Sequence, residues 1–243
     1  MAPKKWKEIK DDPKWEELRE EDVQNRIEVK PKPFKPLNNK QTLAIKVLED
    51  NQIIVLSGES GSGKSHIALA YATQLFKEGK IKKILLSRPL VECGGEKMGY
   101  FPGSEMEKMS GWARPSTDLL KNFYPDPKEL GELIKIGAIE ITSLSMMRGL
   151  TYNDTIMVLE EGQNTNKIQL KMWLSRIGQN TKCIICADLE QSDLINCREP
   201  PLVDVIRRIR NIQGVGIVKF DVEDIVRSGI VQDVIRALKE DNY

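Results

Sequence analysis

Short apolar runs recur along the chain and alternate with stretches in which hydrophobic side chains are three or four residues apart. The runs are typical of buried strands, and the wider spacing is typical of amphipathic helices. We expect strands at 53–56, 83–87, 139–142, 155–159, 183–187 and 215–220, and helices at 38–48, 66–72, 127–135, 167–176, 201–210 and 221–239. This alternation predicts an α/β fold of three layers, with a doubly wound, mostly parallel sheet and its ligand at the carboxyl ends of the strands.

Two stretches interrupt this pattern. Residues 1–36 carry dense charge of both signs and five prolines, so we expect an N-terminal arm ahead of a single domain at 37–243. The arm is either a solvated tail with one short helix, or it is anchored by its tryptophans to this domain or to a neighbouring subunit. The second stretch, about 91–118, contains five glycines and is expected to be an irregular insertion.

Aromatic and basic side chains alternate within the insertion, between Gly94 and Arg114. Single-stranded RNA or DNA binds to such surfaces, because bases stack on the rings and cations neutralise the phosphates. A lid whose aromatic side chains pack onto the core would have the same composition. The sequence leaves both interpretations open.

A phosphate-binding loop is predicted at Gly58–Ser65 (the phosphate loop), where the spacing is G-x-x-x-x-G-K-S between an expected strand and an expected helix. Its backbone N–H groups and the start of the helix would face phosphate oxygens. Lys64 would neutralise the β- and γ-phosphates, and the Ser65 hydroxyl would bind Mg²⁺. The predicted nucleotide-binding residues are Gln41, Gly58, Glu59, Ser60, Gly61, Ser62, Gly63, Lys64, Ser65 and His66.

Gln41 precedes the phosphate loop by about 20 residues, and an amide can bond both N6 and N7 of adenine. It could equally cap its helix or be exposed to solvent. No Asn-Lys-x-Asp guanine-binding motif follows the loop. The sequence therefore favours ATP over GTP.

Two glutamates directly follow the expected strand at 155–159. One carboxylate in this position orders Mg²⁺, and the next activates the attacking water, so we assign Glu160 to the metal and Glu161 to the base. A water-activating glutamate favours hydrolysis over transfer to a small molecule. Gln191, which follows the neighbouring strand, is expected to sense the γ-phosphate.

Composition narrows the remaining possibilities. The formal net charge is +1, so a nucleic acid would have to meet a local basic patch. No apolar run approaches the roughly 18 residues of a membrane span, and we expect a cytoplasmic protein without membrane contact. Cys183 and Cys186 match C-x-x-C, but an odd separation on a strand points the two sulfurs to opposite faces, so we expect buried, reduced thiols.

The order of several short motifs resembles the PhoH-like family, RecA-type P-loop ATPases related to the core of superfamily 1 helicases. These motifs, which span about residues 37–240, are Gln41, Gly58 to Ser65, Arg88-Pro89, Gly99 to Gly103, Met147-Arg148-Gly149, Glu160 to Asn164, Leu174 to Gly178, Asp188 to Gln191 and Asp224 to Arg227. The resemblance implies ATP hydrolysis with Mg²⁺, assembly into a homo-oligomeric ring, for which a hexamer is one candidate size, and a link to RNA.

The chain departs from the family pattern at three places. Glu160-Glu161-Gly162-Gln163 stands where the family usually has Asp-Glu-Ala-Gln, Arg148-Gly149-Leu150-Thr151 where it has Arg-Gly-Arg-Thr, and Ala187-Asp188 where it has Gly-Asp. These changes and the near-zero net charge keep an alternative open, in which the chain is an ATP-binding regulatory or assembly module that engages a protein partner with little turnover.

Related helicases complete their site with arginines from a second core domain, and this chain has one such domain. An arginine supplied to the γ-phosphate is worth about 10³ to 10⁵ in rate, so we expect one arginine to act on the site of a neighbouring subunit. The candidates are Arg148, Arg176 and Arg227, each next to a motif near a strand end.

Overall fold

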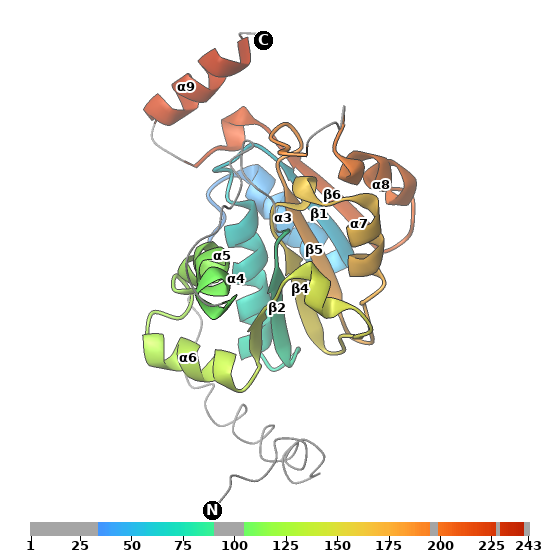
Figure 1. Cartoon of the computed structure of the whole chain (residues 1–243). Coiled ribbons are helices and arrows are strands. Elements are labelled where there is room, and N and C mark those ends of the chain that lie inside the picture. Colours follow the sequence, from blue (N-terminus) through green and yellow to red (C-terminus); the bar gives the residue numbers. More distant parts are fainter. Residues whose placement is uncertain (1–33, 90–104, 195–198, 227–228, 241–243) are drawn as a thin grey trace, which may run out of the picture.

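The computed structural model describes residues 34–89, 105–194, 199–226 and 229–240 (Figure 1). Its centre is a six-stranded sheet in the order β3-β2-β4-β5-β1-β6, in which every pairing is parallel. The strands are β1 Ile53–Gly58, β2 Lys83–Ser87, β3 Ile139–Ile141, β4 Thr155–Leu159, β5 Lys182–Ala187 and β6 Val215–Phe220. The predicted α/β class and parallel sheet are confirmed.

Helices cover both faces of the sheet (Figure 1). One face carries α3 Asn39–Asp50, α4 Lys64–Lys77, α5 Glu105–Leu120 and α6 Pro127–Lys135, and the other carries the short helix η2 Leu144–Met147, α7 Lys167–Leu174 and α8 Pro201–Ile209. The short helices η3 Gly162–Asn164 and η4 Val222–Asp224 and the final helix α9 Gly229–Glu240 complete the described elements. None of the described helices combines the length and apolarity that a membrane crossing needs.

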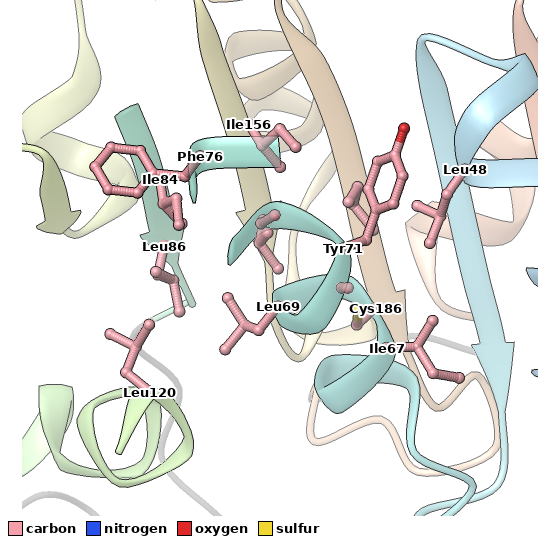
Figure 2. Close-up of a cluster of buried hydrophobic side chains, with 14 of the residues drawn as sticks. Leu48, Ile67, Leu69, Tyr71, Phe76, Ile84, Leu86, Leu120, Ile156 and Cys186 are labelled. Carbon is pink, nitrogen blue, oxygen red and sulfur yellow. The ribbon is translucent and has the colours of Figure 1, made fainter. Parts of the chain in front are cut away.

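Helix α4 is the centre of the larger hydrophobic cluster. Ile67, Leu69 and Phe76 of α4 are buried, and Leu120 of α5 packs into the same cluster (Figure 2). A helix that is apolar on nearly all sides must be covered on all sides. The sheet, α3 and α5 provide that cover.

The two strand cysteines lie on opposite faces, as predicted. Cys186 belongs to the cluster around α4, and Cys183 belongs to the cluster around α7. Both are free and buried, and burial raises the pKa of each thiol to about 12. They are therefore protonated, unreactive core side chains.

The prediction of an irregular segment through 91–118 is wrong for its second half. Residues 105–120 form α5, although the helix includes Gly111 and Pro115. The proline removes one backbone N–H, but Ser116 and Leu120 are buried, and this packing outweighs the local preference. Residues 90–104, with most of the aromatic and glycine positions of the insertion, lie outside the described residues, as does the arm up to residue 33.

The last predicted helix, 221–239, is also corrected. Asp221 and Asp224 cap each other in the short helix η4, and α9 begins only at Gly229. Acidic residues before an apolar run are common at a helix start, but here they close a separate turn.

Candidate nucleotide-binding site

The phosphate loop joins β1 to α4, and its glycines are required for different reasons. Gly58 has φ 125° and lies against β6, where a Cβ atom would collide with the backbone carbonyl of Phe220. Gly63 has φ 87° and is the N-cap of α4, with the Gln41 amide beside it. Residues other than glycine rarely adopt these backbone conformations. The strand–loop–helix arrangement predicted from the spacing is present.

Lys64 is folded back onto its own loop. Its ammonium donates to the carbonyl oxygens of Gly58 and Glu59, each at 2.7 Å. Burial lowers the pKa of Lys64, while the nearby carboxylates of Asp188 and Glu161 oppose that shift. The cation is thus held inside the loop, where phosphate oxygens would meet it.

A pocket of 270 Å³ opens between the phosphate loop and the carboxyl ends of β4 and β5. We call it the phosphate-loop pocket, and its lining residues are Ser60, Gly61, Gly63, Lys64, Ser65, His66, Leu119, Glu161, Gln163, Cys186, Ala187, Asp188 and Gln191. The structure therefore brings together Lys64, Ser65, Glu161 and Gln191, which the sequence analysis placed in one site. Ligand binding at the carboxyl ends of parallel strands is the rule for this class of fold.

Glu161 follows β4 in a left-handed conformation, with φ 52°. Its side chain is exposed in the pocket, and Oε2 accepts a hydrogen bond of 2.8 Å from Gln163 Nε2. An exposed carboxylate with one oxygen bonded to an amide is well placed to accept a proton from water.

Gln163 connects the ends of the two strands, and the sequence analysis did not select it as a site residue. Its Oε1 accepts from the Asp188 backbone N–H at 3.0 Å, and its Nε2 donates to the Gln191 carbonyl at 3.2 Å as well as to Glu161. The amide stands in the same short motif as Glu161. That position, two residues after Glu161, was the signal in the sequence that could have found it.

Asp188 was also missed. Its Oδ2 accepts from the Ser60 backbone N–H at 2.9 Å, which ties the phosphate loop to the end of β5. Burial raises the pKa of Asp188, against the opposing charge of Lys64.

Glu160 does not line the pocket with Glu161. It is 8% exposed, and its Oε2 accepts a hydrogen bond of 2.6 Å from the Ser116 hydroxyl on α5. Cys186 lines the pocket, and its pKa is raised by burial and then by the Glu160 charge. Of the two predicted metal residues, Ser65 lines the pocket and Glu160 does not.

Gln41 and His66 flank the loop on its α3 and α4 sides. Gln41 is 2% exposed, accepts from the Leu37 N–H at 2.8 Å and donates to the Ser62 carbonyl at 3.3 Å. Ring centroids place His66 4.9 Å from Phe123 and 5.8 Å from Phe34. Burial lowers the pKa of His66, so its imidazole is neutral at pH 7.

The donor set suits a magnesium ion that is shared with phosphates. Within the described ranges, no group of three or more His, Cys, Asp or Glu side chains could hold a metal ion. Mg²⁺ in nucleotide sites uses one or two protein oxygens together with phosphate oxygens and water. The Ser65 hydroxyl and the Glu160 carboxylate are oxygens of that kind.

The candidate arginines lie elsewhere. Arg148 and Arg176 line a second cavity of 440 Å³ (the basic groove), and neither lines the phosphate-loop pocket. The groove is formed by Leu144, Ser145, Arg148, Ile168, Gln169, Lys171, Met172, Ser175 and Arg176. Arg227 is outside the described residues.

The profile of the PhoH-like protein family matches residues 33–239. The PhoH-like protein of Bacillus subtilis (strain 168) is 34% identical over 229 residues, which cover 94% of this chain and 70% of that protein. This chain belongs to the PhoH-like family. Protein PhoH of Escherichia coli (strain K12) is 32% identical over 212 residues, 84% of this chain and 58% of that protein. The family and the phosphate loop together indicate a nucleotide-binding P-loop NTPase.

The chain spans between 58% and 70% of the length of these two relatives. Among solved structures, the Sulfolobus solfataricus SWI2/SNF2 ATPase core in complex with dsDNA is 15% identical, with a TM-score of 0.40. The alignment covers 64% of this chain and 34% of that chain. A similarity of this size carries no argument about function.

Proposed function

We propose that this PhoH-like chain is an Mg²⁺-dependent ATPase. The observation that carries the proposal is the phosphate-loop pocket, where Lys64 and Ser65 face Glu161 and Gln191 from the ends of two neighbouring strands. A pocket with a phosphate-binding loop on one side and an exposed carboxylate on the other suits hydrolysis of a phosphoanhydride.

Each residue of the site has a role in ATP binding or hydrolysis in this proposal. The loop N–H groups and Lys64 bind and orient the β- and γ-phosphates. The Gln41 amide is buried and bonded at both ends within the chain, so it supports the loop from α3 and is not assigned to adenine. Ser65 and Glu160 would hold Mg²⁺, which neutralises charge on the phosphates when it is bound. Glu161 accepts the proton of the attacking water, and Gln163 keeps its carboxylate oriented. Gln191 senses the γ-phosphate.

ATP turnover by the parent protein, Lys64→Ala and Glu161→Gln tests this function. Lys64→Ala is expected to lose both nucleotide binding and turnover. Glu161→Gln is expected to keep binding and to lose turnover by about 10²- to 10⁴-fold, the usual contribution of a general base. Turnover in Glu161→Gln at the parent rate would contradict the assigned base.

One observation favours the second function, an ATP-binding regulatory or assembly module. The predicted Mg²⁺ residue Glu160 is 8% exposed, bonds to the Ser116 hydroxyl and does not line the phosphate-loop pocket. A parent protein that binds ATP, loses this binding with Lys64→Ala and shows no turnover would establish the module and exclude the ATPase.

We also propose a homo-oligomeric ring that acts on single-stranded RNA or DNA in a helicase-like manner, through the segment from Gly94 to Arg114. In the described part of that segment, Trp112 is half-buried and Arg114 forms an exposed ion pair of 3.6 Å with Asp118. ATP turnover that rises with single-stranded RNA, and RNA binding that weakens with salt, would support this proposal. Turnover and oligomerisation that ignore RNA and DNA would favour a protein partner.

A further inference from the structure

The end of α5 and the turn after it form a wall of the phosphate-loop pocket. Ser116, Leu119 and Leu120 follow the i, i+3, i+4 spacing that puts side chains on one side of a helix, and Phe123 lies in the turn after α5. Leu119 lines the pocket, Leu120 is fully buried, and the Phe123 ring contacts His66 at the start of α4. Ser116 is the polar member of this otherwise apolar set.

A buried serine here needs a specific partner. Ser116 is 1% exposed, and an alanine would pack at the same position without leaving a hydroxyl to satisfy. The hydroxyl donates to Glu160 Oε2 at 2.6 Å, a length typical of an O–H group bonded to a carboxylate. The buried carboxylate and the buried hydroxyl therefore satisfy each other.

Two hydrogen bonds fix Glu160, one that its side chain accepts and one that its backbone donates. Its backbone N–H donates to the Ser87 carbonyl at 2.9 Å, which continues the pairing of β4 with β2. Its side chain then reaches α5, a span for which aspartate would be one methylene too short. Among the described residues, no hydrogen bond engages Glu160 Oε1, and this is the oxygen that a metal-bound water would meet.

We propose that Ser116 is the positioning residue of Glu160, an outer partner that sets the orientation of this buried carboxylate and couples α5 to the nucleotide site. The assignment rests on the proposed Mg²⁺-dependent function. Outer partners of this kind fix the rotamer of a ligand, and their loss costs about 10- to 100-fold in metal affinity.

The test measures binding of a fluorescent, non-hydrolysable ATP analogue as a function of Mg²⁺ concentration. Ser116→Ala is expected to raise the Mg²⁺ concentration at half-maximal effect by about 10- to 100-fold, with Mg²⁺-free binding of the analogue unchanged. Ser116→Thr keeps the hydroxyl and is expected to restore most of the parent requirement. Thr117→Val is the matched control, because Thr117 is the next residue of α5 and its hydroxyl bonds only the Ala113 carbonyl.

A double-variant comparison separates positioning from packing. In Glu160→Asp, whose carboxylate is too short for the contact, adding Ser116→Ala is expected to change the Mg²⁺ requirement no further. A full additional shift there would overturn the assignment. If the parent depends on Mg²⁺ and Ser116→Ala has the same Mg²⁺ requirement as the parent, the assignment is also overturned. This result would leave the proposed function intact. Parent binding that ignores Mg²⁺ would overturn the assignment and the metal part of the proposed function together.

Discussion

The phosphate-loop pocket and the basic groove differ in what holds their polar side chains. In the pocket, Gln163 and Asp188 join the ends of two strands and the phosphate loop through hydrogen bonds of 2.8 to 3.2 Å. In the groove, no hydrogen bond or ion pair within the described residues engages the side chain of Arg148 or Lys171, and both side chains are exposed. No carboxylate lines the groove. The first site is organised within one chain, and the second presents unpaired cations outward.

This difference suggests that the groove completes a site on another molecule. The two cavities share no lining residue, so the groove arginines do not line the pocket of their own chain. Unpaired cations with no acidic neighbour suit a phosphate that arrives from outside. We infer that Arg148 serves the phosphate-loop pocket of a neighbouring subunit, and the following predictions test the separation of the two sites.

Arg148→Ala is expected to give the largest effect. If the arginine acts on a neighbouring γ-phosphate, turnover of the assembled protein falls by about 10³-fold or more while ATP binding is kept. Steady-state turnover and analogue binding measure the two quantities. Mixing Arg148→Ala subunits with Lys64→Ala subunits is expected to restore part of the turnover, because some sites then combine an intact loop with an intact arginine.

Lys171→Ala is the matched control for that experiment. Lys171 lies in the same groove and has the same charge, but it was not a candidate for the trans role. Equal losses from Arg148→Ala and Lys171→Ala would indicate a general charge effect. Turnover of Arg148→Ala at the parent rate would end the trans hypothesis for this residue.

Arg176→Ala is expected to act on stability rather than on the reaction. Its guanidinium donates to the Leu150 carbonyl at 2.8 Å, the Met172 carbonyl at 3.2 Å and the Ser175 hydroxyl at 3.1 Å. Loss of this half-buried clamp should lower the free energy of unfolding by about 1–3 kcal/mol, measured by urea unfolding. Arg148→Ala should leave the unfolding midpoint unchanged. Unchanged stability with a large loss of turnover would instead make Arg176 the trans arginine.

Local patterns predicted most of the fold because each strand and most helices carry their own periodicity. Helix α5 was missed because Gly111 and Pro115 weaken the local pattern, while the burial of Ser116 and Leu120 depends on chain segments far away in sequence. Tertiary packing decided this element, and propensity did not.

The site was predictable where spacing alone determines geometry, as in the phosphate loop and Glu161. The sequence did not predict that Glu160 and Glu161 diverge. Glu160 continues the strand alternation toward the α5 side, whereas Glu161 turns into the pocket with φ 52°. The role of Gln163 depends on β4 lying next to β5, which is a property of the sheet order.

The smallest expected effect concerns pH and separates the two sites by their titratable groups. His66 is the single histidine of the chain and lines the phosphate-loop pocket, whereas no histidine or carboxylate lines the basic groove. Burial lowers the pKa of His66 below 6.5, so the unfolded chain binds its proton at a higher pH than the folded chain does. Folding stability linked to His66 is therefore complete above about pH 6.5 and is lost as the pH falls toward the lowered pKa.

Replacing His66 isolates this contribution from the carboxylates, which titrate in both proteins. His66→Gln is expected to flatten the pH dependence of the unfolding free energy below about pH 6.5, as measured by urea unfolding at each pH. Asp188 has a raised pKa and acts with the opposite sign, but it is common to both proteins and cancels in their difference. The Lys171→Ala groove variant should follow the parent curve throughout. If His66→Gln also followed the parent curve, the imidazole would have the same pKa in the folded and unfolded chains, and its packing between Phe34 and Phe123 would not exclude the proton.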